Sequence, residues 1–185
     1  MTAAAKLPTY DDLCALPAGI TGQIILGTLY AQPRPAVPHA LATAALGEEL
    51  GPPFKRGRGG PGGWLILDEP ELHLGGDVLV PDLAGWRRTR LLEAPNAPYI
   101  ELAPDWVCEV LSPSTAALDR GDKRAVYLRE RVETIWLVDP QQRTLEVLEL
   151  DGPTYRLLDV FTGDAKVRAR PFHAIELELA LLWAR

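Results

Sequence analysis

Two carboxylates lie in or beside apolar segments of the chain. Asp82 ends the run Val78–Asp82, and Glu109 lies within the run Trp106–Leu111. An acidic side chain in an apolar strand is costly unless it is paired or binds a cation. If the two segments are neighbouring strands, the two carboxylates converge. Two carboxylates with a backbone oxygen and water form a site for a hard cation such as Mg²⁺ or Mn²⁺.

A lysine is placed to serve the same site. Lys123 follows Glu109 by fourteen residues and falls in the first turns of a helix predicted over 119–131. If that helix packs beside the second strand, the ammonium can orient an attacking water or stabilise a phosphorane-like transition state. Taken singly, an exposed edge carboxylate and a solvated helix lysine are the commoner settings of these residue types. Asp119 is expected to cap the helix.

The elements that must position these residues follow from hydrophobic periodicity and turn signals. The expected helices are 9–16, 39–50 and 119–131. The expected strands are 23–26, 28–32, 64–67, 71–74, 77–86, 106–111, 134–138, 144–150 and 154–160, with a last apolar segment at 175–182. Pro81, inside one of these strands, indicates an edge position or a bulge. The pattern predicts an α+β fold, with a largely antiparallel or mixed sheet flanked by a few helices.

The composition is that of a folded globular protein. The chain has 185 residues, of which 47% are hydrophobic and 24% charged. These values predict one domain over 1–185 with a full core, and they exclude disorder and coiled coil as the main state. The longest apolar runs are too short to span a membrane. Because the first residues contain no apolar segment of signal-peptide length, a cytoplasmic protein is expected.

The charge balance restricts how the chain could bind nucleic acid. The net charge is −6, whereas proteins that coat nucleic acid non-specifically are usually basic. Any such contact must therefore come from a local patch. The Gly-rich loop over 55–63 carries Lys55, Arg56 and Arg58, which could contact phosphates. A solvated surface loop explains the same residues equally well.

Four segments occur in an order that resembles a known family. They are Val80–Leu83 (VPDL), Trp106–Thr115 (WVCEVLSPST), Asp119–Lys123 (DRGDK) with Tyr127, and Thr134–Pro140 (TIWLVDP). The chain resembles the Uma-type family of bacterial restriction endonucleases, within the PD-(D/E)XK nuclease superfamily. The match is continuous from about residue 80 to 150 and looser before it. It implies a restriction-endonuclease-like mixed sheet flanked by helices, with an N-terminal hairpin and additional C-terminal strands.

The resemblance also implies roles for individual residues. Asp82 corresponds to the acidic residue of the PD half-motif, and Glu109 corresponds to the D/E of the second half. By the same correspondence, the carbonyl oxygen of Val110 is a further metal ligand. The motif lysine is expected at position 111, where this chain has Leu111. In this family the next helix supplies the lysine, and Lys123 stands at that place.

Two further positions bear on the activity. Relatives often have a glutamate and an aspartate in the N-terminal hairpin, where this chain has Gln23 and Leu26. If that glutamate assists metal binding in relatives, its absence here favours weak or lost activity. His39 opens the helix over 39–50. It could face the site, although a capping or surface position is the more common one.

Three hypotheses for the function follow. The first is an endonuclease that depends on Mg²⁺ or Mn²⁺ and hydrolyses phosphodiester bonds, with DNA as the expected substrate. The second is a nuclease-fold module that binds nucleic acid or protein with weak or no catalysis. The third is a structural, dimerising protein. A homodimer is compatible with all three and is expected for the first, because cutting both strands of a duplex calls for two active sites.

Overall fold

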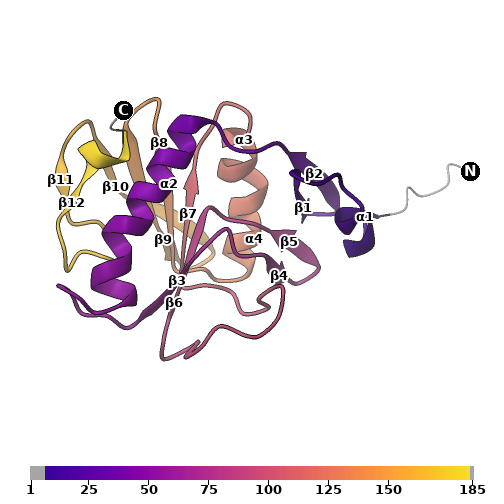
Figure 1. The fold of residues 1–185 in the computed structure, drawn as a ribbon, viewed down its shortest axis with the longest axis horizontal. Helices are drawn as coiled ribbons and strands as arrows, with labels where there is room; N and C mark the ends of the chain where they lie inside the picture. Colours follow the sequence, from indigo (N-terminus) through magenta and orange to yellow (C-terminus); the bar gives the residue numbers. More distant parts are fainter. Residues whose placement is uncertain (1–6, 184–185) are drawn as a thin grey trace, which may run out of the picture.

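A six-stranded mixed sheet forms the centre of the molecule (Figure 1). The computed structural model describes residues 7–183. The strands, in spatial order, are β10 (Thr154–Thr162), β9 (Thr144–Asp151), β8 (Thr134–Asp139), β7 (Trp106–Val110), β6 (Leu83–Arg87) and β3 (Trp64–Asp68). The neighbours are antiparallel except for β7 and β8, which are parallel. The predicted α+β class with a mixed sheet is confirmed.

The parallel pair requires a crossover connection, which a helical segment over 116–129 supplies. This segment consists of α3 (Ala116–Leu118), a wider π-helical turn (Asp119–Lys123) and α4 (Arg124–Arg129). The predicted helix is therefore present but begins earlier than expected. Asp119 lies inside the helical segment and not at its N-terminus. The prediction that Asp119 caps the helix is wrong.

A smaller, four-stranded sheet lies to one side of the large one (Figure 1). Its strands, in spatial order, are β2 (Thr28–Gln32), β1 (Thr21–Ile25), β5 (Asp77–Leu79) and β4 (Leu72–Leu74). The β1–β2 hairpin turns through Leu26 and Gly27, with φ angles of 50° and 76°. Positive φ at both positions matches the twist of the flanking strands. The predicted N-terminal hairpin is confirmed.

The predicted strand over 77–86 is wrong, because the chain changes sheets in its middle. β5 ends at Leu79 in the small sheet, and β6 begins at Leu83 in the large one. Between them, the Val80 N–H donates to the Gln23 side chain at 2.9 Å. Pro81 has no N–H to continue a ladder. The crossing leaves Asp82 immediately before β6, between the two sheets.

Each face of the large sheet has its own hydrophobic core. α2 (Val37–Leu50) and the following π-helical turn (Gly51–Lys55) cover one face. The core on this α2 side is aromatic, with ring contacts among Trp64, Trp106, Trp136 and Phe172. The core on the other side, the α4 side, includes Val126 and Tyr127 of α4 together with buried residues of β4, β5 and β6.

The two ends of the described chain pack at opposite sides of the fold (Figure 1). α1 (Tyr10–Cys14) has the expected capping box of Thr9 and Asp12 and contacts β1. The segment predicted at 175–182 forms β12 (Leu177–Glu178) and a 3₁₀ turn (Leu179–Leu182) against α2; β12 pairs with β11 (Lys166–Val167). Within residues 7–183, no helix has the length and apolarity needed to cross a bilayer.

Candidate active site

Glu109 points to the α4 side of the large sheet. Successive side chains of a strand alternate between its faces. Cys108 and Val110 pack in the α2-side core. Val107 and Leu111 pack in the α4-side core. The buried carboxylate of Glu109 meets its partners at the helical segment 116–129, where the chain supplies an ammonium and a phenol.

The two carboxylate oxygens of Glu109 have different partners. Lys123 Nζ donates to Oε2 at 2.9 Å, and the Tyr127 hydroxyl donates to Oε1 at 2.5 Å. Lys123 Nζ also lies 3.1 Å from Asp119 Oδ1. Asp119, Lys123 and Tyr127 follow one another at intervals of four residues, so they lie on one face of the helical segment. Glu109, Asp119 and Lys123 have side chains that are 1%, 3% and 4% exposed.

The network places three carboxyl groups around one ammonium. Burial raises the pKa of Glu109 to about 8, since Asp119 and Asp82 add to the effect of burial and Lys123 only partly opposes it. Burial by itself would lower the pKa of Lys123, because it disfavours the charged ammonium. The carboxylates of Glu109 and Asp119 outweigh that effect and raise the pKa of Lys123. The lysine is therefore a firmly held cation among three carboxylates.

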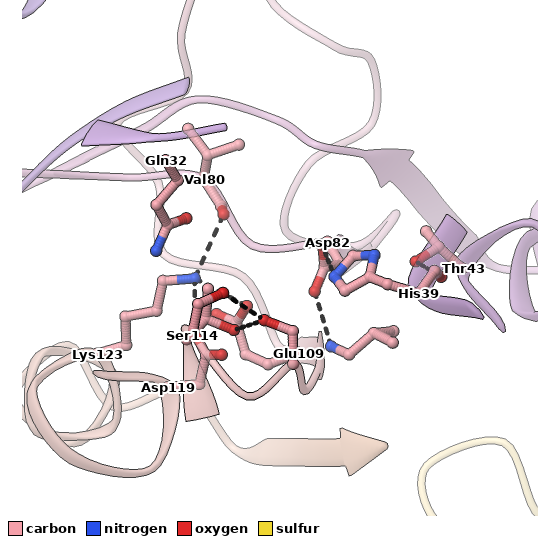
Figure 2. A network of polar contacts seen from close by, with 12 residues as sticks. Gln32, His39, Thr43, Val80, Asp82, Glu109, Ser114, Asp119 and Lys123 are labelled. Atoms are coloured by element: carbon pink, nitrogen blue, oxygen red, sulfur yellow. Dashed lines mark hydrogen bonds and ion pairs between the residues drawn. The ribbon is translucent and has the colours of Figure 1, made fainter. Parts of the chain in front are cut away.

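Asp82 lies beside this network and is held at both oxygens. Its Oδ2 accepts the Val110 N–H at 2.7 Å, and its Oδ1 lies 3.1 Å from His39 Nε2 at the start of α2 (Figure 2). The N–H and C=O of one strand residue point to the same edge. The Val110 carbonyl therefore points to the β6 side of β7, where Asp82 lies. The contact with Asp82 outweighs burial and raises the pKa of His39.

Asp82 opens onto a cleft of about 820 Å³. The cleft is lined by the β2 strand, the start of α2, the crossing at Val80 and Asp82, and the segment 112–118. Lys123 lies behind the wall of the cleft, because Nζ donates at 3.4 Å to the carbonyl of Val80, which lines it. A molecule bound in the cleft would meet Asp82 directly, with the Glu109–Lys123 pair behind it. These residues form a polar site at one end of the large sheet.

The N-terminal hairpin closes one side of the site. The fully buried Gln23 accepts the Val80 N–H and donates from Nε2 to Gln32 Oε1 at 3.2 Å. Gln32 lines the cleft near Lys123 (Figure 2). Gln23 thus contacts the residue whose carbonyl binds Lys123. Leu26 lies instead in the exposed hairpin turn, and its N–H donates a hydrogen bond to the Asp77 carboxylate.

The structure brings Asp82, Glu109, Val110 and Lys123 together at one end of β6 and β7. Asp82 and Glu109 offer carboxylate oxygens and Val110 a main-chain oxygen, which are ligands that Mg²⁺ and Mn²⁺ accept. The basic residues Lys55 and Arg56 are not part of this cleft. They line a separate groove of about 480 Å³ along α2.

Asp119 and Tyr127 had no site role in the sequence interpretation. The spacing of Asp119, Lys123 and Tyr127 would have revealed one helix face, but Asp119 was expected at a cap. The preferred capping or surface position for His39 is wrong, because its ring is 12% exposed and faces Asp82. The sequence gives no signal for this contact, because His39 and Asp82 are 43 residues apart and only the fold brings them together.

Comparisons with known proteins identify the family and the fold. The family model of Uma2, described as "Putative restriction endonuclease", matches residues 7–181. No curated protein matches the chain. The crystal structure described as "a putative nuclease belonging to DUF820" from Anabaena variabilis ATCC 29413 superposes with a TM-score of 0.76 at 24% identity. That match covers 95% of this chain and 97% of the other, and it shows a common fold. Because the family model spans nearly the whole length, the chain belongs to the Uma2 family of restriction-endonuclease-like proteins.

Proposed function

We propose that the protein is a metal-dependent endonuclease that hydrolyses phosphodiester bonds of DNA. The observation that supports this most directly is the convergence of Asp82 with the Glu109–Lys123 pair beside a cleft. Membership of a family described as "Putative restriction endonuclease" points to the same reaction. Phosphodiester hydrolysis of this type needs no covalent nucleophile, because the attacking group is water.

The donor set suits Mg²⁺ or Mn²⁺. Among residues 7–183, no three His, Cys, Asp or Glu side chains converge in a way that could hold a metal ion by themselves. Mg²⁺ is usually bound by one or two carboxylates while it keeps water and substrate phosphate as its other ligands. Asp82, Glu109 and the Val110 carbonyl match that pattern. Bound there, the ion would lower the pKa of a water and neutralise charge on the phosphate.

The remaining residues have roles that follow from their contacts. Lys123 is held between Glu109 and Asp119 behind the Val80 wall of the cleft, so its ammonium can stabilise negative charge that develops on the phosphate. Tyr127 fixes the Glu109 carboxylate through its hydroxyl. Val110 fixes Asp82 through its N–H. These restraints set the positions of the acidic groups before substrate binds.

The test is cleavage of supercoiled plasmid and single-stranded DNA with Mg²⁺, Mn²⁺ or a chelator. Asp82→Asn and Glu109→Gln keep the side-chain shapes and replace one carboxyl oxygen by an amide nitrogen that cannot bind a cation, so we expect each to lower the rate by at least about a hundredfold. Glu71→Gln is a matched control. Glu71 is a half-buried carboxylate that binds Tyr10 and His73 instead of the cleft. Folded Asp82→Asn or Glu109→Gln proteins that cut at the wild-type rate would refute the proposal.

A second function, binding without cleavage, is favoured by two observations. Both oxygens of Glu109 are engaged by protein groups, and Gln23, at a position where the resemblance implies a glutamate, carries no charge. Under this alternative, the protein would bind DNA or a protein partner and show no metal-dependent cutting. Electrophoretic mobility with labelled DNA, run beside the plasmid assay, separates the two functions.

We also expect the active form to be a homodimer, because cleavage of both strands calls for two sites. Sedimentation equilibrium with and without a DNA duplex measures the assembly. A strictly monomeric protein that nevertheless makes concerted double-strand breaks would contradict this expectation.

A further inference from the structure

His39 makes one polar side-chain contact that the function above does not use. The residue lies in the first turn of α2, and its Nε2 is 3.1 Å from Asp82 Oδ1. The ring lines the cleft together with Asp82 (Figure 2). The α2 backbone is thereby linked to the crossing between the two sheets. The contact joins elements that are distant in sequence at the carboxylate that faces the cleft.

The other ring nitrogen shows that His39 is poorly suited to a packing role. Nδ1 is buried and has no hydrogen-bond partner in the described part of the chain. A buried polar atom without a partner costs stability, whereas an apolar side chain of similar size would leave no such atom. The imidazole therefore gains a favourable contact with Asp82 at Nε2 but leaves Nδ1 buried without a hydrogen bond. An unsatisfied group of this kind in a site points to a role other than stability.

The contacts on Asp82 show what that role is. Val110 N–H holds Oδ2 at 2.7 Å, and His39 holds Oδ1. Two contacts on two oxygens fix both the direction and the plane of the carboxylate. Each oxygen can still accept a further interaction, because an ionised carboxylate has about four lone-pair sites. Partners that orient a ligating carboxylate in this way commonly change metal affinity or activity about 10–100-fold.

We propose that His39 is a positioning residue, which orients the Asp82 carboxylate so that its free lone pairs face a divalent cation in the cleft. This inference rests on the metal site of the proposed function, since it assigns Asp82 as a ligand. Without His39, Asp82 keeps the Val110 contact but rotates about it. The cation site then weakens while the fold is retained.

The test measures Mn²⁺ binding by calorimetry, thermal unfolding without metal, and cleavage for four proteins. His39→Leu removes the Nε2 contact and the unpaired Nδ1. His39→Gln places an amide nitrogen where Nε2 was. His73→Leu is the matched control, because His73 Nε2 also contacts a carboxylate, Glu71 Oε1 at 2.8 Å, away from the cleft.

We expect His39→Leu to weaken Mn²⁺ binding at least about tenfold with an unfolding temperature equal to or above that of the wild type. His39→Gln should recover most of the affinity, and His73→Leu should bind Mn²⁺ like the wild type. Unchanged Mn²⁺ affinity in His39→Leu, or no Mn²⁺ binding by the wild type, overturns the proposal. So does a large loss of unfolding temperature without rescue by glutamine. Mn²⁺ binding that depends on His39, without cleavage of any DNA, would refute the nuclease and leave this inference standing.

Discussion

Asp119 and Lys123 form a 3.1 Å ion pair one turn apart, and both side chains are almost wholly buried. The pair lies in the π-helical turn between α3 and α4, and Lys123 contacts Glu109 from the same position. Lys123 is thus shared between a carboxylate of its own helical segment and a carboxylate of β7. Asp119 anchors the ammonium from the helix side, so the lysine does not depend on Glu109 alone for its position.

The first prediction concerns this anchor. Asp119→Asn keeps the shape of the side chain and removes its charge. We expect a loss of about 2 kcal/mol in the free energy of unfolding, since a hydrogen bond between charged groups is replaced by one to a neutral amide. Cleavage should fall about tenfold because Lys123 is less firmly held. Urea unfolding and the plasmid assay measure the two effects. Asp151→Asn is the control, because Asp151 is an exposed carboxylate at the end of β9 that pairs with Arg156 away from the cleft. Equal stability of Asp119→Asn and the wild type would contradict the assignment.

A second prediction concerns the Tyr127 hydroxyl, which donates a hydrogen bond to Glu109. Tyr127→Phe removes the 2.5 Å hydrogen bond and leaves Glu109 Oε1 buried without a partner. An unsatisfied buried acceptor costs about 1–3 kcal/mol, which chemical denaturation detects. Tyr155→Phe is a useful comparison, because Tyr155 donates to the Val132 carbonyl outside the site. Both variants should be destabilised, but only Tyr127→Phe should also lose cleavage. A loss of cleavage in both would indicate a general effect of stability.

The positions of the strands could be predicted from the sequence, but the change of sheet could not. The run from Val78 to Trp86 is apolar almost throughout, and a continuous apolar run carries no signal for the sheet in which a strand lies. Pro81 indicated an irregularity at the right place. What it could not indicate is that the preceding N–H bonds a glutamine of another strand. That contact creates the corner that presents Asp82.

Contacts of the candidate site between residues close in the sequence could be predicted, whereas contacts between distant residues could not. Asp119, Lys123 and Tyr127 lie at intervals of four residues, so their common face could be predicted from spacing alone. The Asp82–Glu109 convergence needed the pairing of β6 with β7. The contact between His39 and Asp82 depends on how α2 packs against the end of β6, which neither periodicity nor composition encodes.

A third prediction tests the burial of β7. The chain has two cysteines, of which Cys14 is exposed and Cys108 is buried. Burial, with the nearby carboxylates of Asp82 and Glu109, raises the pKa of the Cys108 thiol, which stays protonated and unreactive. At pH 8 a thiol reagent should label one cysteine in the native protein and two in denaturant. Cys14→Ser should reduce native labelling to none. Rapid labelling of Cys108 in that variant would show that β7 is open to solvent.

The last prediction concerns Gln23, which lies beneath the cleft with Val80 and Gln32 as partners. In Gln23→Glu, one carboxylate oxygen still accepts the Val80 N–H, and the added negative charge lies close to the residue that Lys123 contacts. Because the position is fully buried, the uncompensated charge should lower the free energy of unfolding by about 2–4 kcal/mol in the absence of metal. A cation that binds the folded state alone restores stability in proportion to its occupancy. Mn²⁺ should therefore raise the unfolding temperature of Gln23→Glu more than that of the wild type. Gln23→Met, which loses the hydrogen bonds to both Val80 and Gln32 without adding charge, should show no such gain. If Mn²⁺ stabilises all three proteins equally, position 23 does not contribute to the cation site, and the glutamine cannot account for weak activity.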